Sequence, residues 1–114
     1  MKETAIQQAV RLALSQAGAV MFRNNQGAYQ DDQGRWIKYG VCNPGGSDLI
    51  GWTPIQVTQD MVGKTVAVFT AVEVKTPKGK VTDAQQNFID QVNKAGGRAG
   101  VVRSPDDAQL LLKL

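Results

Sequence analysis

The sequence contains no histidine and a single cysteine, and both absences remove classes of chemistry. Without histidine the chain cannot build a Ser-His or Cys-His catalytic pair, and it lacks the commonest general base. Cys42 alone cannot form an internal disulfide, and without histidine it cannot join a Cys/His zinc site. We therefore expect any catalysis to rest on carboxylates and lysines, and we expect Cys42 to be a packed thiol.

Aromatic residues and long apolar runs are also scarce. Aromatic side chains make up 6% of the chain, which argues against the deep apolar pocket of an enzyme for small molecules. No apolar stretch approaches the roughly 18 residues that would span a bilayer. The first residues open into a polar helical pattern without the apolar segment of a secretory signal. These features predict a cytoplasmic protein with no membrane association.

The length and composition are those of a small globular protein. The 114 residues, 42% hydrophobic and 20% charged, suffice for one domain with its own core. A net charge of +3 and a pI near 9.2 are compatible with a polyanionic partner but do not require one. We predict a single domain over residues 1–114.

The hydrophobic spacing predicts a mixed α/β fold. The expected helices cover residues 3–17 and begin again after the N-caps Thr82 and Ser104. The expected strands are residues 19–23, 36–41, 66–76 and 98–103, together with a short strand within residues 43–52. Residues 24–28 have turn chemistry, and Asp31 and Asp32 lie in a polar loop, so we interpret these two acids as turn formers rather than metal ligands.

The longest predicted strand, residues 66–76, carries Glu73-Val74-Lys75 near its end. Because side chains alternate along a strand, Glu73 and Lys75 face the same side. Charged side chains on an otherwise apolar strand need partners. Two interpretations follow: an edge strand with a surface ion pair, or a metal site in which Asp48 and Glu73 bind Mg²⁺ and Lys75 reaches the reacting group.

Three further polar residues have the spacing to join such a site. Glu3 and Gln7 lie along the inward edge of the first predicted helix. Gln85 occupies the N3 position of a capping box that Thr82 begins, and it also lies on the apolar stripe of that helix. Each of the three is either a solvated or capping residue or a contributor to the site.

The order and separation of these pieces resemble a known family. The pieces are Glu3 with Ile6-Gln7, Arg23-Asn24-Asn25, Gly46-Ser47-Asp48, Glu73-Val74-Lys75, Gln85 before Phe88, Gly96-Gly97 and Val102-Arg103-Ser104. Together they resemble the stand-alone VRR-NUC domains of phages and bacteria, which belong to the PD-(D/E)XK nuclease superfamily. The resemblance covers nearly the whole chain.

The resemblance implies an α/β fold with a restriction-endonuclease-like α-β-β-β-α-β core, in which helices flank a central mixed sheet. It also implies a phosphodiesterase that depends on Mg²⁺ or Mn²⁺. The active-site residues that it implies are Asp48, Glu73, Lys75 and Gln85.

The residue chemistry agrees with this implication. Phosphodiester hydrolysis needs an activated water and stabilised charge, and a divalent metal supplies both without histidine. Asp48 and Glu73 would hold the ion, with the Val74 carbonyl as a candidate third ligand. Lys75 would orient or help deprotonate the attacking water, and Gln85 would position Lys75 or water.

DNA is the expected partner of such a site. The basic residues expected along its path are Arg23, Lys78, Lys80 and Arg103. Glu3 is a candidate outer-shell or second-metal carboxylate. A nucleic-acid-binding module without catalysis would use the same basic residues but would not need Asp48 and Glu73, which repel phosphate unless a metal intervenes. A hydrolase of small phosphate compounds would need a deeper pocket.

The resemblance further implies a homodimer that cuts four-way (Holliday) junctions, and the alternative is a repair nuclease directed to flaps or DNA ends. A two-fold dimer would present two equivalent sites to a pseudo-symmetric junction. Apolar residues that either form the dimer interface or complete a small core are Trp36, Ile37, Trp52, Ile55 and Met61.

Overall fold

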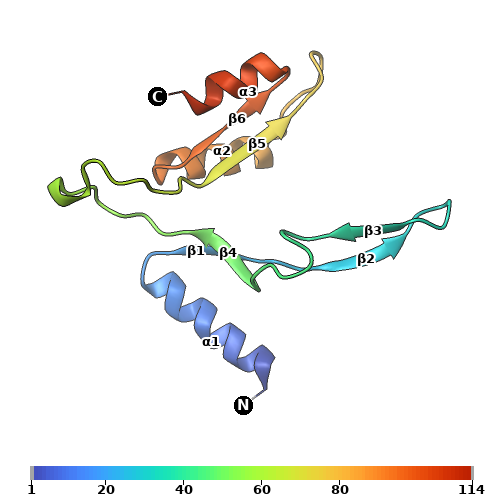
Figure 1. Ribbon diagram of the computed structural model, residues 1–114, viewed down its shortest axis with the longest axis horizontal. Helices are drawn as coiled ribbons and strands as arrows, with labels where there is room; N and C mark the ends of the chain where they lie inside the picture. Colours follow the sequence, from blue (N-terminus) through green and yellow to red (C-terminus); the bar gives the residue numbers. More distant parts are fainter. Residues whose placement is uncertain (1, 114) are drawn as a thin grey trace. The chain divides into compact units, whose positions relative to one another are not determined.

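The structure is a computed structural model that describes residues 2–113 of the chain. Helices and strands follow one another in the order labelled in Figure 1. The elements are α1 (Glu3–Gln16), β1 (Val20–Arg23), β2 (Gly27–Gln30), β3 (Trp36–Tyr39), β4 (Leu49–Trp52), the 3₁₀ helix η1 (Gln59–Met61), β5 (Thr70–Val74), α2 (Asp83–Lys94), β6 (Arg98–Val102) and α3 (Pro105–Leu112). The predicted mixed α/β class is confirmed.

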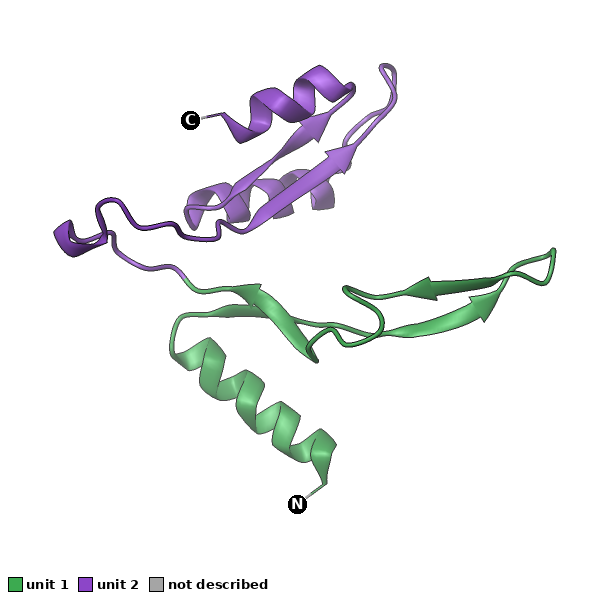
Figure 2. Ribbon diagram, in the orientation of Figure 1, with its two compact units in different colours: residues 1–53 green, residues 54–114 purple. Residues whose placement is uncertain are grey.

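The chain forms two compact units, residues 1–53 and residues 54–114 (Figure 2). Across residues 2–113 the strands pair two by two: β1 with β4 and β2 with β3 are antiparallel, and β5 with β6 is parallel. A single domain and one central mixed sheet therefore stay predictions.

In the first unit, α1 leads into the β1–β4 ladder. The helix ends close to its predicted end, where Gly18 takes a φ of 96° that favours glycine. None of the residues of α1 is buried, and Ile6 is 47% exposed. In the ladder Phe22 and Trp52 pack their rings together at 5.5 Å between centroids.

The β2–β3 hairpin departs from the predicted turn over residues 24–28, because Gly27 and Ala28 belong to strand β2. The carboxylate of Asp31 accepts the backbone N–H groups of Gln33 and Arg35, which folds the chain back on itself. Asp31 is thus confirmed as a turn former. The residues of β2 show no alternation of apolar and polar side chains, so its sequence alone did not predict the strand.

In the second unit, α2 and α3 pack on the parallel β5–β6 pair. Thr82 and Gln85 form the predicted capping box, and Ser104 caps α3 with Pro105 in its first turn, as predicted. The buried apolar side chains of this unit are Ile89, Val92, Ala99 and Val102.

Strand β5 is shorter than predicted, because residues 66–69 lie outside it. Its partner β6 begins at Arg98, directly opposite Thr70, so earlier residues have no strand to pair with. At this end of the strand pair, the Arg98 N–H donates to the Phe69 carbonyl at 2.9 Å.

The prediction for Cys42 was wrong, since its thiol is exposed. Cys42 lies in an irregular loop and has a φ of 54°, in the left-handed region. A separate expectation concerns membranes: across residues 2–113, every helix is too short or too polar to cross a bilayer.

Candidate active site

Glu73, Lys75 and Gln85, here called the strand cluster, come together in the second unit. Glu73 lies on β5, and Lys75 follows its last residue with its N–H donating to the Val102 carbonyl at 3.1 Å. This bond extends the strand conformation, so both side chains face one side, as predicted. The Lys75 Nζ atom lies 3.5 Å from the Glu73 Oε1 atom.

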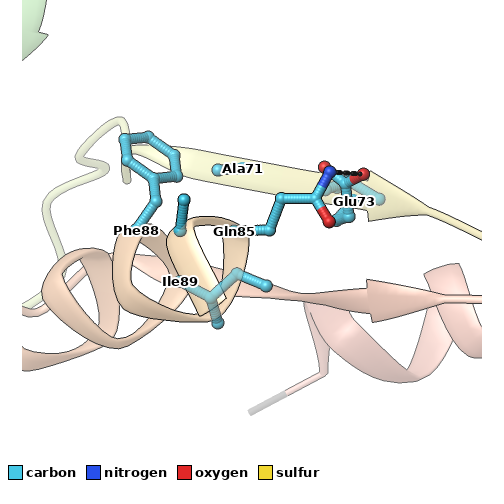
Figure 3. A pocket seen from close by; sticks show the side chains of 7 residues that line it. Ala71, Glu73, Gln85, Phe88 and Ile89 are labelled. Atoms are coloured by element: carbon cyan, nitrogen blue, oxygen red, sulfur yellow. Dashed lines mark hydrogen bonds between the residues drawn. The ribbon is translucent and has the colours of Figure 1, made fainter. Parts of the chain in front are cut away.

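Gln85 joins the strand cluster through a single amide with two tasks. Its Oε1 atom accepts the Thr82 N–H at 3.0 Å, which closes the capping box at the start of α2. Its Nε2 donates to Glu73 Oε1 at 2.9 Å (Figure 3). The capping role of Gln85 is therefore confirmed, and the same residue contacts Glu73, the candidate metal ligand, while its role in the site stays a prediction.

An apolar cavity of about 300 Å³ lies between side chains of β5 and α2, and Glu73 and Gln85 of the cluster line it. Figure 3 shows the Glu73 and Gln85 side chains at one end of it and Phe88 at the other. Glu73 keeps 32% of its side chain exposed and Lys75 keeps 20%. The cluster is thus half-buried against apolar surface, where water competes less for its charges.

The turn after Lys75 is fastened by Arg103. The Arg103 Nη1 group donates to the carbonyl oxygens of Thr76 at 2.6 Å and Gly79 at 2.7 Å. Lys78 within the turn and Lys80 after it are exposed. The Arg103 guanidinium, predicted to bind DNA, thus donates hydrogen bonds to backbone oxygens of the turn. Its contact with DNA stays a prediction.

Asp48 lies in the first unit, at the end of an irregular segment here called the Asp48 loop (residues 40–48). Its side chain is exposed, and β4 begins directly after it. Asp48 lines a polar cavity of about 350 Å³ together with other residues of this unit. The others are Glu3, Thr4, Gln7, Arg23, Asn24, Asn25 and Gln26.

The polar cavity brings together residues that the sequence placed far apart. Glu3 and Gln7 reach it from α1, Arg23 from the end of β1, and Asp48 from its loop. Two carboxylates and one guanidinium thus share one hollow. This supports a site role for Glu3 and Gln7, which the sequence left open beside simple solvation.

Sequence reasoning missed the amide side chains that hold the Asp48 loop. Asn24 and Gln26 donate to backbone carbonyls of the loop, and Asn43 within it donates to the carbonyls of Gly27 and Tyr39. The sequence signal for these bonds is the high density of Asn, Gln and Gly in residues 24–27 and 43–46. The same composition is typical of turns, so it did not point to bonds between the two segments.

The donor chemistry fits a hard divalent ion. Asp48, Glu3 and Glu73 offer carboxylate oxygens at exposed or half-exposed positions, as Mg²⁺ and Mn²⁺ require when they keep several water ligands. In the part of the chain that the structure describes, His, Cys, Asp and Glu form no group of three or more that could hold a metal ion.

A comparison with family models decides which family these residues represent. The model described as the VRR-NUC domain matches residues 2–106. The chain belongs to the VRR-NUC family. No curated protein and no solved structure matches it. Membership in the VRR-NUC family implies a nuclease-type function in DNA processing.

The two units of this VRR-NUC chain each hold part of the predicted site. The second unit brings together three of the four predicted active-site residues, Glu73, Lys75 and Gln85. The first unit gathers Asp48 with Glu3 and Arg23 in the polar cavity.

Proposed function

We propose that this VRR-NUC protein is a metal-dependent DNA endonuclease with Asp48, Glu73, Lys75 and Gln85 in its active site. The observation that carries the proposal is the strand cluster: a half-buried carboxylate with an ammonium group at 3.5 Å and an amide N–H at 2.9 Å. An ordinary surface ion pair does not need a helix cap to orient its carboxylate. A carboxylate that binds a metal does need such a partner, because its oxygen atoms must be held in one direction.

Each residue of the proposed site has its own role. Asp48 and Glu73 bind Mg²⁺ or Mn²⁺ with the Val74 carbonyl, and Glu3 acts as an outer-shell carboxylate. When bound, the ion lowers the pKa of water and offsets charge on the phosphate. Lys75 orients the attacking water or accepts its proton.

Gln85 has a more specific role than the sequence indicated. By donating to Glu73 Oε1 it restricts the rotation of that carboxylate, and its own amide is fixed by the Thr82 N–H. The cap of α2 therefore orients a metal ligand on β5. This is a positioning role, since Gln85 acts through Glu73.

The decisive experiment measures cleavage of labelled DNA with each metal added to metal-free protein. Asp48→Asn and Glu73→Gln each remove a ligand charge at constant shape, so cleavage should fall by orders of magnitude while the far-ultraviolet spectrum stays unchanged. Asp32→Asn is the matched control, because it removes an exposed acid of the first unit with no proposed role in metal binding or cleavage. Wild-type cleavage by Asp48→Asn would contradict the assignment.

DNA contacts are proposed for Lys78, Lys80, Arg23 and Arg103. Replacing Lys78 and Lys80 by Ala should weaken binding to all sequences alike and lower the salt slope of log K by about one unit for each lost phosphate contact. An unchanged slope would place both lysines away from DNA.

The proposed substrate is branched DNA, above all four-way junctions, cut by a homodimer. One site cannot cut two strands symmetrically, whereas a two-fold dimer presents two. Candidate interface residues differ in exposure: Trp36 and Ile55 are 69% and 64% exposed, while Trp52 and Met61 are half-buried. This ranks Trp36 and Ile55 above Trp52 and Met61.

Assembly and substrate can be tested together. Light scattering should give twice the chain mass of 12.3 kDa, and a four-way junction should receive paired, opposed nicks in preference to linear duplex. A stable monomer that prefers flaps or DNA ends would contradict the junction proposal and leave the nuclease proposal standing.

A further inference from the structure

Asn24 lies where the β1–β4 ladder meets the Asp48 loop. Its Nδ2 donates to the carbonyl oxygens of Val41 and Ser47, each at 3.0 Å, and its Oδ1 accepts the Val41 N–H at 2.8 Å. Its backbone N–H donates to the Asp48 carbonyl at 2.8 Å. One residue thus binds the beginning of the loop, the residue before Asp48 and Asp48 itself.

The Asp48 loop needs such bonds, because helices and strands supply none within it. Cys42 has a φ of 54°, which non-glycine residues adopt only when their surroundings impose it. A second amide, Gln26 Nε2, donates to the Gly46 carbonyl at 2.7 Å, and the Gly46 N–H donates to the Cys42 carbonyl at 2.7 Å. Side chains therefore determine the conformation that a ladder determines elsewhere.

We propose that Asn24 is a positioning residue that holds Asp48 in the conformation that binds the metal; this inference rests on the proposed function. Asp48 is exposed, so its own packing does not order it. Without Asn24, metal binding would have to order the whole loop, and the entropy cost would appear as lost affinity. The cleavage rate at saturating metal would change less, since the printed bonds of the Asn24 side chain go to the loop backbone.

The test separates metal affinity from turnover in the full chain. Mn²⁺ binding is measured by calorimetry without DNA, and cleavage is measured against Mn²⁺ concentration. For Asn24→Ala the Mn²⁺ dissociation constant should rise about tenfold or more, as for other outer-shell residues. The half-saturating Mn²⁺ concentration in cleavage should rise with it, and saturating Mn²⁺ should restore most of the rate.

A second substitution at the same position tests the hydrogen bonds themselves. Asn24→Leu keeps nearly the same shape but can neither donate to the carbonyl oxygens of Val41 and Ser47 nor accept the Val41 N–H. We expect no rescue, with metal affinity as low as in Asn24→Ala. Wild-type affinity in Asn24→Leu would overturn the proposal, because shape alone would then suffice.

Asn93 provides a matched control in the second unit. Its Nδ2 donates to the Ala99 carbonyl at 3.0 Å, and its Oδ1 accepts the Ala99 N–H at 2.9 Å, the same pairing that Asn24 makes with Val41. Asn93→Ala should lower stability without changing the Mn²⁺ dissociation constant. An equal rise in both variants would mean general destabilisation and would overturn the inference.

Two further variants keep the outcome decisive. If Asn24→Ala does not fold, Gln26→Ala removes one bond from the same loop and should raise the dissociation constant about fivefold. If Asp48→Asn abolishes Mn²⁺ binding while Asn24→Ala and Gln26→Ala leave it unchanged, the inference is overturned and the proposed function stands. If Asp48→Asn changes neither binding nor cleavage, the proposed function itself is overturned.

Discussion

The two units of this VRR-NUC protein hold their proposed catalytic residues by different means. Glu73 is fixed by a parallel ladder and by the cap of a helix, both of which are regular structure. Asp48 ends an irregular loop that asparagine and glutamine side chains fasten. In a ladder, several equivalent backbone hydrogen bonds hold the conformation. In the loop, the conformation depends on a few side-chain hydrogen bonds.

The largest expected contrast is between glycines of the two units. A Cβ added at Gly46 in the Asp48 loop would overlap the backbone carbonyl oxygen of Val41, which the Asn24 bonds prevent from moving. A Cβ at Gly100 in β6 would lie 3.0 Å from Leu111 Cδ1, the end of a flexible side chain. The two positions should therefore differ sharply in their tolerance of alanine.

Gly46→Ala should lower the free energy of unfolding by about 3 kcal/mol, whereas Gly100→Ala should change it by less than about 1 kcal/mol. Urea unfolding measures both. Trp36 and Trp52, the two tryptophans of the chain, lie in the first unit, so their fluorescence reports on the unfolding of that unit. Circular dichroism reports on the helices of both units. Equal losses would show that the loop is no more sensitive than the ladder.

This contrast also explains which features could be predicted from the sequence. The capping box of Thr82 and Gln85 and the alternation of Glu73 and Lys75 depend on spacing within one element, which the sequence displays directly. The bonds of Asn24 to Val41 and Ser47 span 17 and 23 residues, and no local period reveals them. The sequence therefore does not reveal the contacts of Asn24, although Arg23-Asn24-Asn25 is part of the family resemblance.

Errors in the predicted strands have the same origin. Strand β2 has no apolar alternation and exists because β3 pairs with it. Residues 66–69 are apolar enough for a strand, yet β6 begins too late to pair with them. Strand pairing is a property of two segments, so a pattern in one segment predicts neither its partner nor its length.

Arg103 offers the next largest effect, in the second unit. Lysine at this position keeps the charge but cannot bridge the carbonyls of Thr76 and Gly79 with one planar group. Arg103→Lys should cost about 1.5 kcal/mol in urea unfolding, the value of a charged hydrogen bond.

A neutral side chain at the same position sharpens the assignment of DNA contacts. If Arg103 binds only the turn, Arg103→Gln leaves the salt slope of DNA binding unchanged, in contrast to Lys78→Ala. A salt slope lowered by Arg103→Gln as much as by Lys78→Ala would instead place the Arg103 guanidinium on a phosphate.

Thr82 tests whether regular structure in the second unit also orients Glu73. Thr82→Ala and Ser104→Ala each remove the side-chain cap of one helix, and each should cost about 1 kcal/mol. The Thr82 hydroxyl also accepts the Gln85 backbone N–H, and the Gln85 side chain donates to Glu73, so cleavage should fall further in Thr82→Ala. The comparison is made at equal stability, by adjusting temperature. Equal cleavage by both variants would mean that the Thr82 N–H, which the substitution keeps, is enough to orient the Gln85 amide.

The smallest expected effect lies in the hairpin turn of the first unit and disappears in acid. The Arg35 backbone N–H donates to Asp31 and lowers the pKa of this carboxyl below its ordinary value of 3.8, and the guanidinium of Arg35 adds to the effect at 2.8 Å. A lowered pKa means that the folded hairpin favours the ionised carboxylate. Its stabilisation is complete above pH 3.8 and is lost as the pH falls through the pKa of the folded state.

Asp31→Asn removes this titration but leaves an oxygen acceptor in the turn. The wild-type hairpin should protect the Gln33 and Arg35 amides from hydrogen exchange better than the variant at pH 6, and the difference should shrink below about pH 3.8. Because both proteins carry the same other carboxylates, their difference isolates Asp31. A difference that stays constant down to pH 2 would mean that the turn depends on shape rather than on charge, as the amide bonds of Asn24 do in the neighbouring loop.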